Sequence, residues 1–179
     1  MTTILMREHK GEVEIAYDSL CTGGTKFELE TEKVFVNESN GLIFGVAGDM
    51  VINPELRYAS FPSVPKNPAL TERWLVSVLI PHLRRLFNEI APRRSDDIMS
   101  MQVLVVVNNQ VYEIGCDLSV LQKKDGVYAI GSGGRIALGA MKVGADLGKA
   151  LEVAAENDSY TGGRLTVTSA RELLKNNKK

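Results

Sequence analysis

Residues 2–18 have the sequence TTILMREHKGEVEIAYD, in which two apolar segments flank a polar break at residues 9–11. In the second segment Val13 and Ile15 alternate with charged residues, which is the pattern of a strand with one buried face. The residues of the break suit a tight turn. We therefore predict that the chain begins with an antiparallel hairpin, and that Asp18 stands where its second strand ends.

Strand patterns recur along the rest of the chain. They predict strands over residues 32–36, 41–48, 101–107, 111–115, 126–130 and 165–168. The dipeptide Asn108-Asn109 joins two of these strands and predicts a two-residue hairpin turn. Residues 22–24, Thr-Gly-Gly, are expected to lie in a loop.

Helical periodicity alternates with these strands. Apolar residues at three- and four-residue steps predict a helix from Ala69 to Ile90 with a kink at Pro81. Four prolines make the segment Asn53–Pro68 a loop with at most a short helical turn. Further helices are expected over residues 136–141 and 147–154, and a polar helix or frayed tail over 171–179.

This order of elements predicts the fold class. Strands, then helices, then strands, then helices and a last strand are typical of an α+β protein with two antiparallel sheets. We expect the sheets to pack face to face and to be covered by helices on both sides, as a four-layer αββα sandwich. The length of 179 residues fits a single domain over residues 1–179 with a polar tail from about residue 170.

Composition excludes several classes of function. A net charge of -1 gives no electrostatic reason to expect nucleic acid as a partner. No stretch approaches the roughly 18–20 apolar residues of a membrane helix, and the start lacks the apolar region of a signal peptide. Cys21 and Cys116 lack the spacing of a zinc site or a disulfide framework. We therefore expect a cytoplasmic protein that is neither exported nor anchored.

The second residue is a candidate nucleophile. A small residue such as Thr2 permits an aminopeptidase to remove Met1, which would leave a hydroxyl and a free amine on one residue. An α-amino group has an ordinary pKa of roughly 7.7–8.0, so it can accept the hydroxyl proton near neutral pH. By itself, Met-Thr-Thr is also an ordinary gene start.

Five separated motifs, in order, resemble the N-terminal nucleophile hydrolases of the proteasome type, which include proteasome β-subunits and the bacterial HslV peptidase. The resemblance covers residues 2 to about 167, and the sequence is similar to an outlying branch of that family. The motifs are Thr2-Thr3-Ile4 with Tyr17-Asp18-Ser19-Leu20-Cys21-Thr22, Lys33-Val34, Gly45-Val46-Ala47-Gly48, Ile130-Gly131-Ser132-Gly133-Gly134, and Asp158-Ser159-Tyr160-Thr161-Gly162-Gly163.

The resemblance implies a catalytic set: Thr2, Asp18, Lys33, Gly48, Ser132, Asp158 and Thr161. Thr2 would attack the scissile carbonyl and form an ester with the acyl group. A lysine close to Thr2 would lower the pKa of its hydroxyl and amine, and Asp18 would hold that lysine in place. Ser132, Asp158 and Thr161 would orient the amine, and the Gly48 N–H would stabilise the oxyanion.

Each assignment also has a structural alternative. Asp18 and Lys33 can form an ordinary surface ion pair, and the glycines around Gly48 can mark a bulge. Residues 131–134 can be a simple strand-to-helix turn, and Asp158 can cap a helix.

The resemblance also implies how substrate is bound. The positions that surround the P1 side chain are Cys21, Thr31, Val46 and Met50, which suggests a medium-sized apolar P1 residue. Thr22 corresponds to a residue whose backbone pairs with an extended substrate, so a peptide or unfolded protein is expected. No cofactor is required. A structural monovalent cation is a possible ligand of backbone carbonyls at Ala155, Asp158 and Thr161.

The family suggests a homo-oligomeric ring or stacked rings as the assembly, with an AAA+ unfoldase as a further candidate partner. The proline-rich segment Asn53–Pro68 replaces a long helix that helps to build the ATPase docking face, which speaks against an HslU-like unfoldase. Leu20 also stands where most proteasome β-subunits carry an arginine. The sequence leaves two alternatives open: a catalytically silent ring subunit, and an amidase that acts on a small amide.

Overall fold

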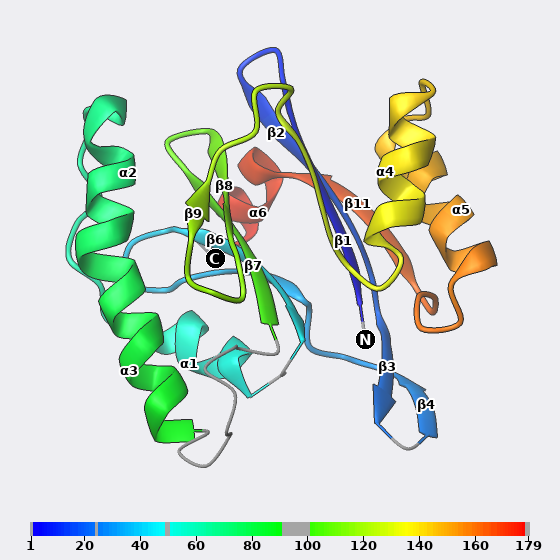
Figure 1. Cartoon of the computed structure of the whole chain (residues 1–179), viewed down its shortest axis with the longest axis horizontal. Coiled ribbons are helices and arrows are strands. Elements are labelled where there is room, and N and C mark those ends of the chain that lie inside the picture. The colour runs from blue at the N-terminus through cyan, green and yellow to red at the C-terminus, as the bar shows by residue number, and fades with distance from the viewer. Residues whose placement is uncertain (1, 24, 49–50, 91–100, 178–179) are drawn as a thin grey trace.

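The structure is a computed structural model, and it describes residues 2–23, 25–48, 51–90 and 101–177. Figure 1 shows two sheets side by side, with helices on the outer side of each. Within the described residues, no helix has the length and apolar character needed to cross a membrane.

The first sheet contains the N-terminal strand near its centre. Its strands run in the order β10-β1-β2-β11 and all pairs are antiparallel. Their bounds are β1 Thr3–His9, β2 Glu12–Asp18, β10 Val127–Gly131 and β11 Leu165–Ser169. The turn between β1 and β2 places Lys10 and Gly11 at φ of 50° and 77°. Two consecutive positive φ angles match the twist of the strands, as a type I′ turn does.

The apolar run in β1 is continuous because both faces of this strand are buried. Ile4 and Met6 belong to the core between the two sheets, whereas Leu5 belongs to the core between the first sheet and helices α4 and α5. All three side chains have 0% exposure. The start of β1 is therefore held from two sides, which fixes the backbone that follows Thr2.

The second sheet has the order β5-β6-β7-β8-β9 and is also antiparallel. Its strands are β5 Val34–Val36, β6 Ile43–Gly48, β7 Met101–Val107, β8 Gln110–Ile114 and β9 Val120–Leu121. Asn108 and Asn109 form the turn between β7 and β8, with φ of 52° and 59°. Asparagine tolerates this left-handed conformation better than most residues.

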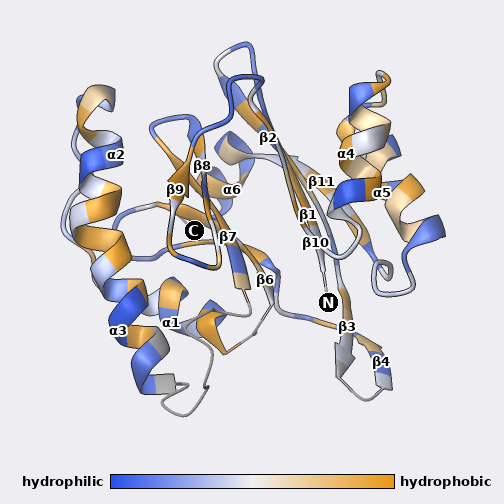
Figure 2. Cartoon of the chain, in the orientation of Figure 1, coloured by the Kyte–Doolittle hydropathy of each residue, from blue (hydrophilic) through white to orange (hydrophobic). Residues whose placement is uncertain are grey.

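Helices pack on the outer side of each sheet. The second sheet is covered by α1 Ile52–Tyr58, α2 Thr71–Trp74, the π-helical segment η2 Leu75–Leu79 and α3 Ile80–Ile90. The short helix η1 Pro68–Leu70, which precedes α2, has no buried residue. The first sheet is covered by α4 Gly134–Lys142 and α5 Leu147–Asn157. The last helix, α6 Ala170–Asn176, follows β11 and packs against the core between the sheets. Figure 2 shows the strands as mainly hydrophobic and the hairpin loops as mainly hydrophilic.

The α+β class and the predicted hairpins are confirmed. The segment Asn53–Pro68 contains most of α1, whose seven residues exceed the short turn that was expected, and it ends at the first residue of η1. The π-helical segment η2 ends at Leu79, two residues before Pro81, which has no N–H to continue the regular bonding. The kink itself stays a prediction.

The expectation of a loop around residues 22–24 was wrong in part. Residues 20–23 and 25–28 form a two-stranded antiparallel hairpin, β3 Leu20–Gly23 with β4 Thr25–Glu28. All four residues of β4 are exposed. A strand with no buried face has no reason to show the alternation from which strands are predicted.

Candidate active site

The ends of β1, β2 and β10 meet at Thr2. Thr2 is 2% exposed and its carbonyl accepts a hydrogen bond of 3.0 Å from the Ser132 N–H. Gly131, which pairs with Thr3, has φ of 87°, and a Cβ at this position would lie 1.7 Å from the Thr2 carbonyl oxygen. Glycine is therefore required here, because only hydrogen leaves room for the backbone of Thr2.

Asp18 and Lys33 form a buried ion pair next to this backbone. Lys33 Nζ donates to Asp18 Oδ1 at 2.9 Å and to the Leu20 carbonyl at 2.6 Å. The same Asp18 oxygen accepts the Thr3 N–H at 2.8 Å, and Oδ2 accepts the Gly162 N–H at 3.2 Å. The surface ion pair considered from the sequence is thus a buried, four-bonded group.

Burial lowers the pKa of Lys33 below its ordinary value. The negative charge of Asp18 and the hydrogen bond to it act in the opposite direction, and so does the nearby Cys21 thiol. A lysine with a lowered pKa changes its protonation more readily and is a functional-site candidate when it lies beside a possible nucleophile.

A second network joins the motifs from the end of the chain. Asp158 Oδ2 accepts hydrogen bonds of 2.6 Å from both Ser132 Oγ and Thr161 Oγ1. Burial acts to raise the pKa of Asp158, but these bonds outweigh it and the pKa is lowered. Asp158 is therefore an acceptor for both hydroxyls, and Ser132 links it to the backbone of Thr2.

Thr3 is a site residue that sequence reasoning missed. Its side chain is 0% exposed, and its hydroxyl lies 2.6 Å from Thr161 Oγ1 and accepts the Gly133 N–H at 3.1 Å. The alternation of side chains along β1 could have predicted the burial of Thr3, because Thr3 faces the same side as Leu5, which is fully buried. A hydroxyl at a buried strand position needs partners of its own.

Gly48 lies at the end of β6. It is exposed, has φ of 127° and is paired in register with Met101 of β7. A φ in this region favours glycine and turns the peptide in a direction that other residues rarely adopt. Its role as oxyanion donor stays a prediction.

The residues predicted around the P1 side chain are in different surroundings. Cys21 and Thr22 lie half-buried on β3, and Thr31 is exposed between β4 and β5. Val46 is 0% exposed and belongs to the core between the second sheet and its helices, so it does not line an open surface. Met50 lies outside the described residues.

The positions predicted for a cation lie around the end of α5. Ala155 is in this helix, Asp158 follows its last residue, and Thr161 is in the turn beyond. The Asp158 carbonyl accepts the Thr161 N–H at 3.1 Å, which leaves one lone pair of that oxygen for another ligand. The cation stays a prediction.

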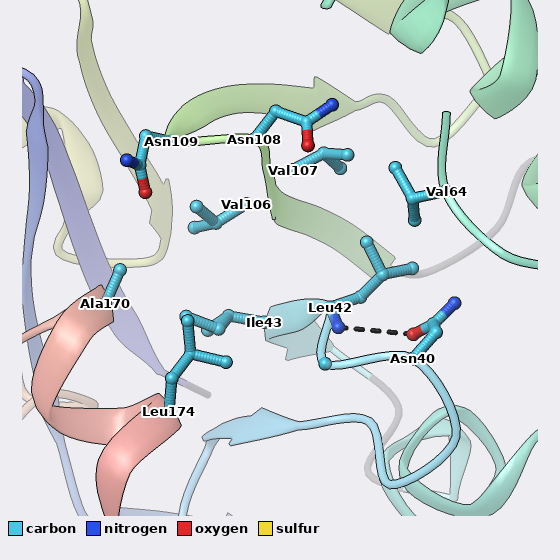
Figure 3. A pocket seen from close by; sticks show the side chains of 11 residues that line it. Asn40, Leu42, Ile43, Val64, Val106, Val107, Asn108, Asn109, Ala170 and Leu174 are labelled. Atoms are coloured by element: carbon cyan, nitrogen blue, oxygen red, sulfur yellow. Dashed lines mark hydrogen bonds between the residues drawn. The ribbon is translucent and has the colours of Figure 1, made fainter. Parts of the chain in front are cut away.

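A cavity of about 250 Å³ lies at the opposite end of β6 and β7 from Gly48. Figure 3 shows residues of β6, β7 and α6 around it, with Leu174 of α6 beside Ile43. None of the described residues predicted for catalysis or substrate binding lines this cavity.

Comparison with known proteins shows a shared fold. Neither a protein-family profile nor a curated protein sequence matches the chain. Among solved structures, BPH of Thiobacillus denitrificans in complex with epoxomicin matches with a TM-score of 0.74 and 21% identity, over 93% of this chain and 97% of that one. BPH alone matches with 0.74 and 22%, over 93% and 96%.

A third match is eukaryotic HslV from Trypanosoma brucei, with a TM-score of 0.61 and 22% identity, over 93% of this chain and 98% of that one. The chain therefore shares the fold of BPH and of HslV. The resemblance seen in the sequence motifs is confirmed at the level of the fold.

Proposed function

We propose that this chain is a threonine-type endopeptidase in which Thr2, once Met1 is removed, is the nucleophile. The observation that carries the proposal is the buried Asp18–Lys33 pair, whose shared oxygen also binds the N–H of Thr3. A buried ion pair is costly to build and is weak evidence of stability, so its place beside Thr2 favours a chemical role.

The reaction divides among these residues as follows. The α-amine of Thr2 accepts the proton of its hydroxyl as the oxygen attacks the scissile carbonyl, and the positive charge of Lys33 stabilises the less protonated forms. The Gly48 N–H donates to the oxyanion of the tetrahedral intermediate. The amine returns the proton to the leaving nitrogen. It then takes a proton from water as the water oxygen attacks the ester carbonyl, and it gives this proton to the Thr2 oxygen, which leaves as the acid product is released.

The role of Ser132, Asp158 and Thr161 is to hold the amine of residue 2 in a fixed orientation. Their hydrogen bonds, together with the bond from the Ser132 N–H to the Thr2 carbonyl, limit the rotation of residue 2. A nucleophile and base on one residue work only if both point at the substrate, so the network is part of the catalytic unit.

The proposal extends to the architecture and the assembly. We propose the four-layer αββα order, since one core lies between the sheets and one lies between each sheet and its helices. We also propose a homo-oligomeric ring or stacked rings that act on peptides or unfolded proteins in the cytoplasm, by analogy with the proteins that share the fold. A requirement for an AAA+ unfoldase is not part of this proposal.

Intact-protein mass spectrometry with an epoxyketone tests the nucleophile. Such a reagent bonds to both the hydroxyl and the free amine of an N-terminal threonine, and the BPH structure contains the epoxyketone epoxomicin. We expect a protein without the Met1 mass that takes one adduct, and a Thr2→Ala variant that takes none and hydrolyses no peptide.

Other outcomes select the alternatives. A protein that retains Met1 and takes no adduct indicates a silent subunit. An adduct without hydrolysis of any peptide, but with turnover of small amides, indicates an amidase. Native mass spectrometry of the same sample tests the ring, and a monomer at assay concentration would contradict it.

A further inference from the structure

The two halves of the candidate active site come from different sheets. Thr2, Asp18 and Ser132 lie at strand ends of the first sheet. Lys33 directly precedes β5, and Gly48 ends β6, so both belong to the second sheet. Catalysis by these groups depends on the distance between the sheets at this end, because reacting atoms must be placed to within about an ångström.

Gln102 forms a polar bridge between the sheets at this point. Its Oε1 accepts the N–H of Gly131 at 3.1 Å, although Gln102 is on β7 and Gly131 is on β10. The N–H of the next residue, Ser132, which follows the end of β10, donates to the Thr2 carbonyl instead. The Gly131 N–H thus has its partner in the other sheet.

The bond between Gln102 and Gly131 lies directly beside residues of both halves of the candidate active site. Gln102 is paired in register with Ala47, the residue before Gly48, and Gly131 is the residue before Ser132. One end of the bridge therefore lies beside Gly48, the proposed oxyanion donor. The other end lies beside Ser132, whose N–H holds the Thr2 carbonyl. The backbone of Gly131 also lies close to that of Thr2, since a Cβ on Gly131 would be 1.7 Å from the Thr2 carbonyl oxygen.

We propose that Gln102 is a positioning residue that fixes the distance between the Gly48 N–H and the Thr2–Ser132 segment. This inference rests on the proposed function. Gln102 touches no reacting atom in this scheme, and it acts by holding the end of β10 against the end of β7. Its loss should lower kcat and leave KM nearly unchanged, because the substrate backbone is expected on β3, away from the bridge.

A different result is expected if the role of Gln102 is purely structural. If Gln102 only provides a partner for a strand N–H, its loss lowers stability but leaves the kinetics of the folded enzyme unchanged. The kinetic constants of folded, assembled variants therefore separate the two roles.

The test compares four variants of the full chain. Gln102→Met keeps the length and removes the acceptor; Gln102→Asn keeps the amide but is too short to reach Gly131. Gln102→Glu keeps the acceptor at the same distance. Gln110→Met is the matched control, since Gln110 lies on β8 at the opposite end of the β7–β8 hairpin.

We expect kcat for a fluorogenic peptide to fall roughly tenfold or more in Gln102→Met and Gln102→Asn, with KM within about twofold of the parent. Gln102→Glu should restore most of kcat, and Gln110→Met should match the parent. Only variants with the parent's assembly state are compared, and if Gln102→Met does not fold, Gln102→Asn supplies the result.

Two results overturn the role of Gln102 while the proposed function stands, and a third overturns both. In an active parent, an unchanged kcat in both acceptor-deficient variants refutes the positioning role alone. An equal loss in Gln102→Glu refutes the hydrogen bond as its basis. A parent that takes no epoxyketone adduct and hydrolyses no peptide instead refutes the proposed function itself, and the role of Gln102 with it.

Discussion

Lys33 Nζ lies 2.9 Å from Asp18 Oδ1, and the two side chains are 1% and 0% exposed. Both charges are thus removed from water together, with the Leu20 carbonyl as a further acceptor for Lys33 and two backbone N–H groups as donors to Asp18. Such a pair is stable only as a unit, because either partner alone would be a buried charge.

Lys33→Ala should therefore damage stability and activity at once. Removing one partner of a buried pair costs about 3–5 kcal/mol, and we expect a loss of this size in the free energy of unfolding by urea. Peptide hydrolysis should fall to background in whatever protein remains folded.

Lys26→Ala is the matched control for that substitution. Lys26 is exposed on β4, so its removal should change stability by less than about 0.5 kcal/mol and leave hydrolysis near the parent rate. Greater damage from Lys26→Ala than from Lys33→Ala would mean that the wrong lysine has been assigned.

Asp158 should make stability depend on acid pH. Its folded pKa lies below the ordinary value of 3.8, so the unfolded chain binds more protons between the two values. Stability contributed by Asp158 is therefore present above 3.8 and is lost as the pH falls through the folded pKa. Urea unfolding over this range should show a steeper loss in the parent than in Asp158→Asn, and parallel curves would count against the network.

Thr3→Val should separate the hydroxyl network from packing. Valine has nearly the shape of threonine, but it removes the acceptor of the Gly133 N–H and one of the two partners of Thr161 Oγ1, which keeps its bond to Asp158. An unsatisfied buried group costs about 1–3 kcal/mol. We expect a loss of this size in thermal or urea unfolding, together with slower hydrolysis.

Thr3→Ser restores the hydroxyl and should recover most of the hydrolysis rate. If Thr3→Ser loses as much activity as Thr3→Val, the hydroxyl alone does not account for the effect of Thr3, and the hydrogen-bond network is not its basis.

Gly131→Ala should disrupt the site from its backbone. The new Cβ would lie 1.7 Å from the Thr2 carbonyl oxygen, at a φ that alanine rarely adopts, so residue 2 must move or the strand end must unpair. We expect loss of epoxyketone labelling even if circular dichroism shows a folded protein.

Gly139→Ala is the corresponding control. A Cβ there meets nothing within 4 Å, and Gly139 lies inside helix α4. The substitution should raise stability by about 0.5–1 kcal/mol, because alanine is the better helix former. Normal labelling of Gly131→Ala would contradict the close packing at Thr2.

The sequence predicts the elements with a periodic pattern well. The β1–β2 hairpin, the Asn108-Asn109 turn and helices α4 and α5 follow from local residue patterns and agree with the structure. The motif order also identified the groups that the structure brings together at Asp18 and Asp158.

Long-range contacts account for what the sequence did not predict. The hydrogen bond between Thr3 and Thr161 spans 158 residues of sequence, and the one between Gln102 and Gly131 spans 29. No local sequence pattern predicts either bond. Val46 was assigned from its motif position to the substrate pocket, but the alternation of β6 directs it into the core with Phe44. Neighbours in one motif can face opposite sides of a sheet.

The burial of Thr2 also affects the entropy cost of reaching the active arrangement. In the folded chain residue 2 is 2% exposed, and its carbonyl is already bonded to Ser132. A residue that folding has ordered in this way loses little further conformational freedom when a substrate binds. The free energy of folding, rather than that of substrate binding, therefore offsets the cost of holding residue 2 in place.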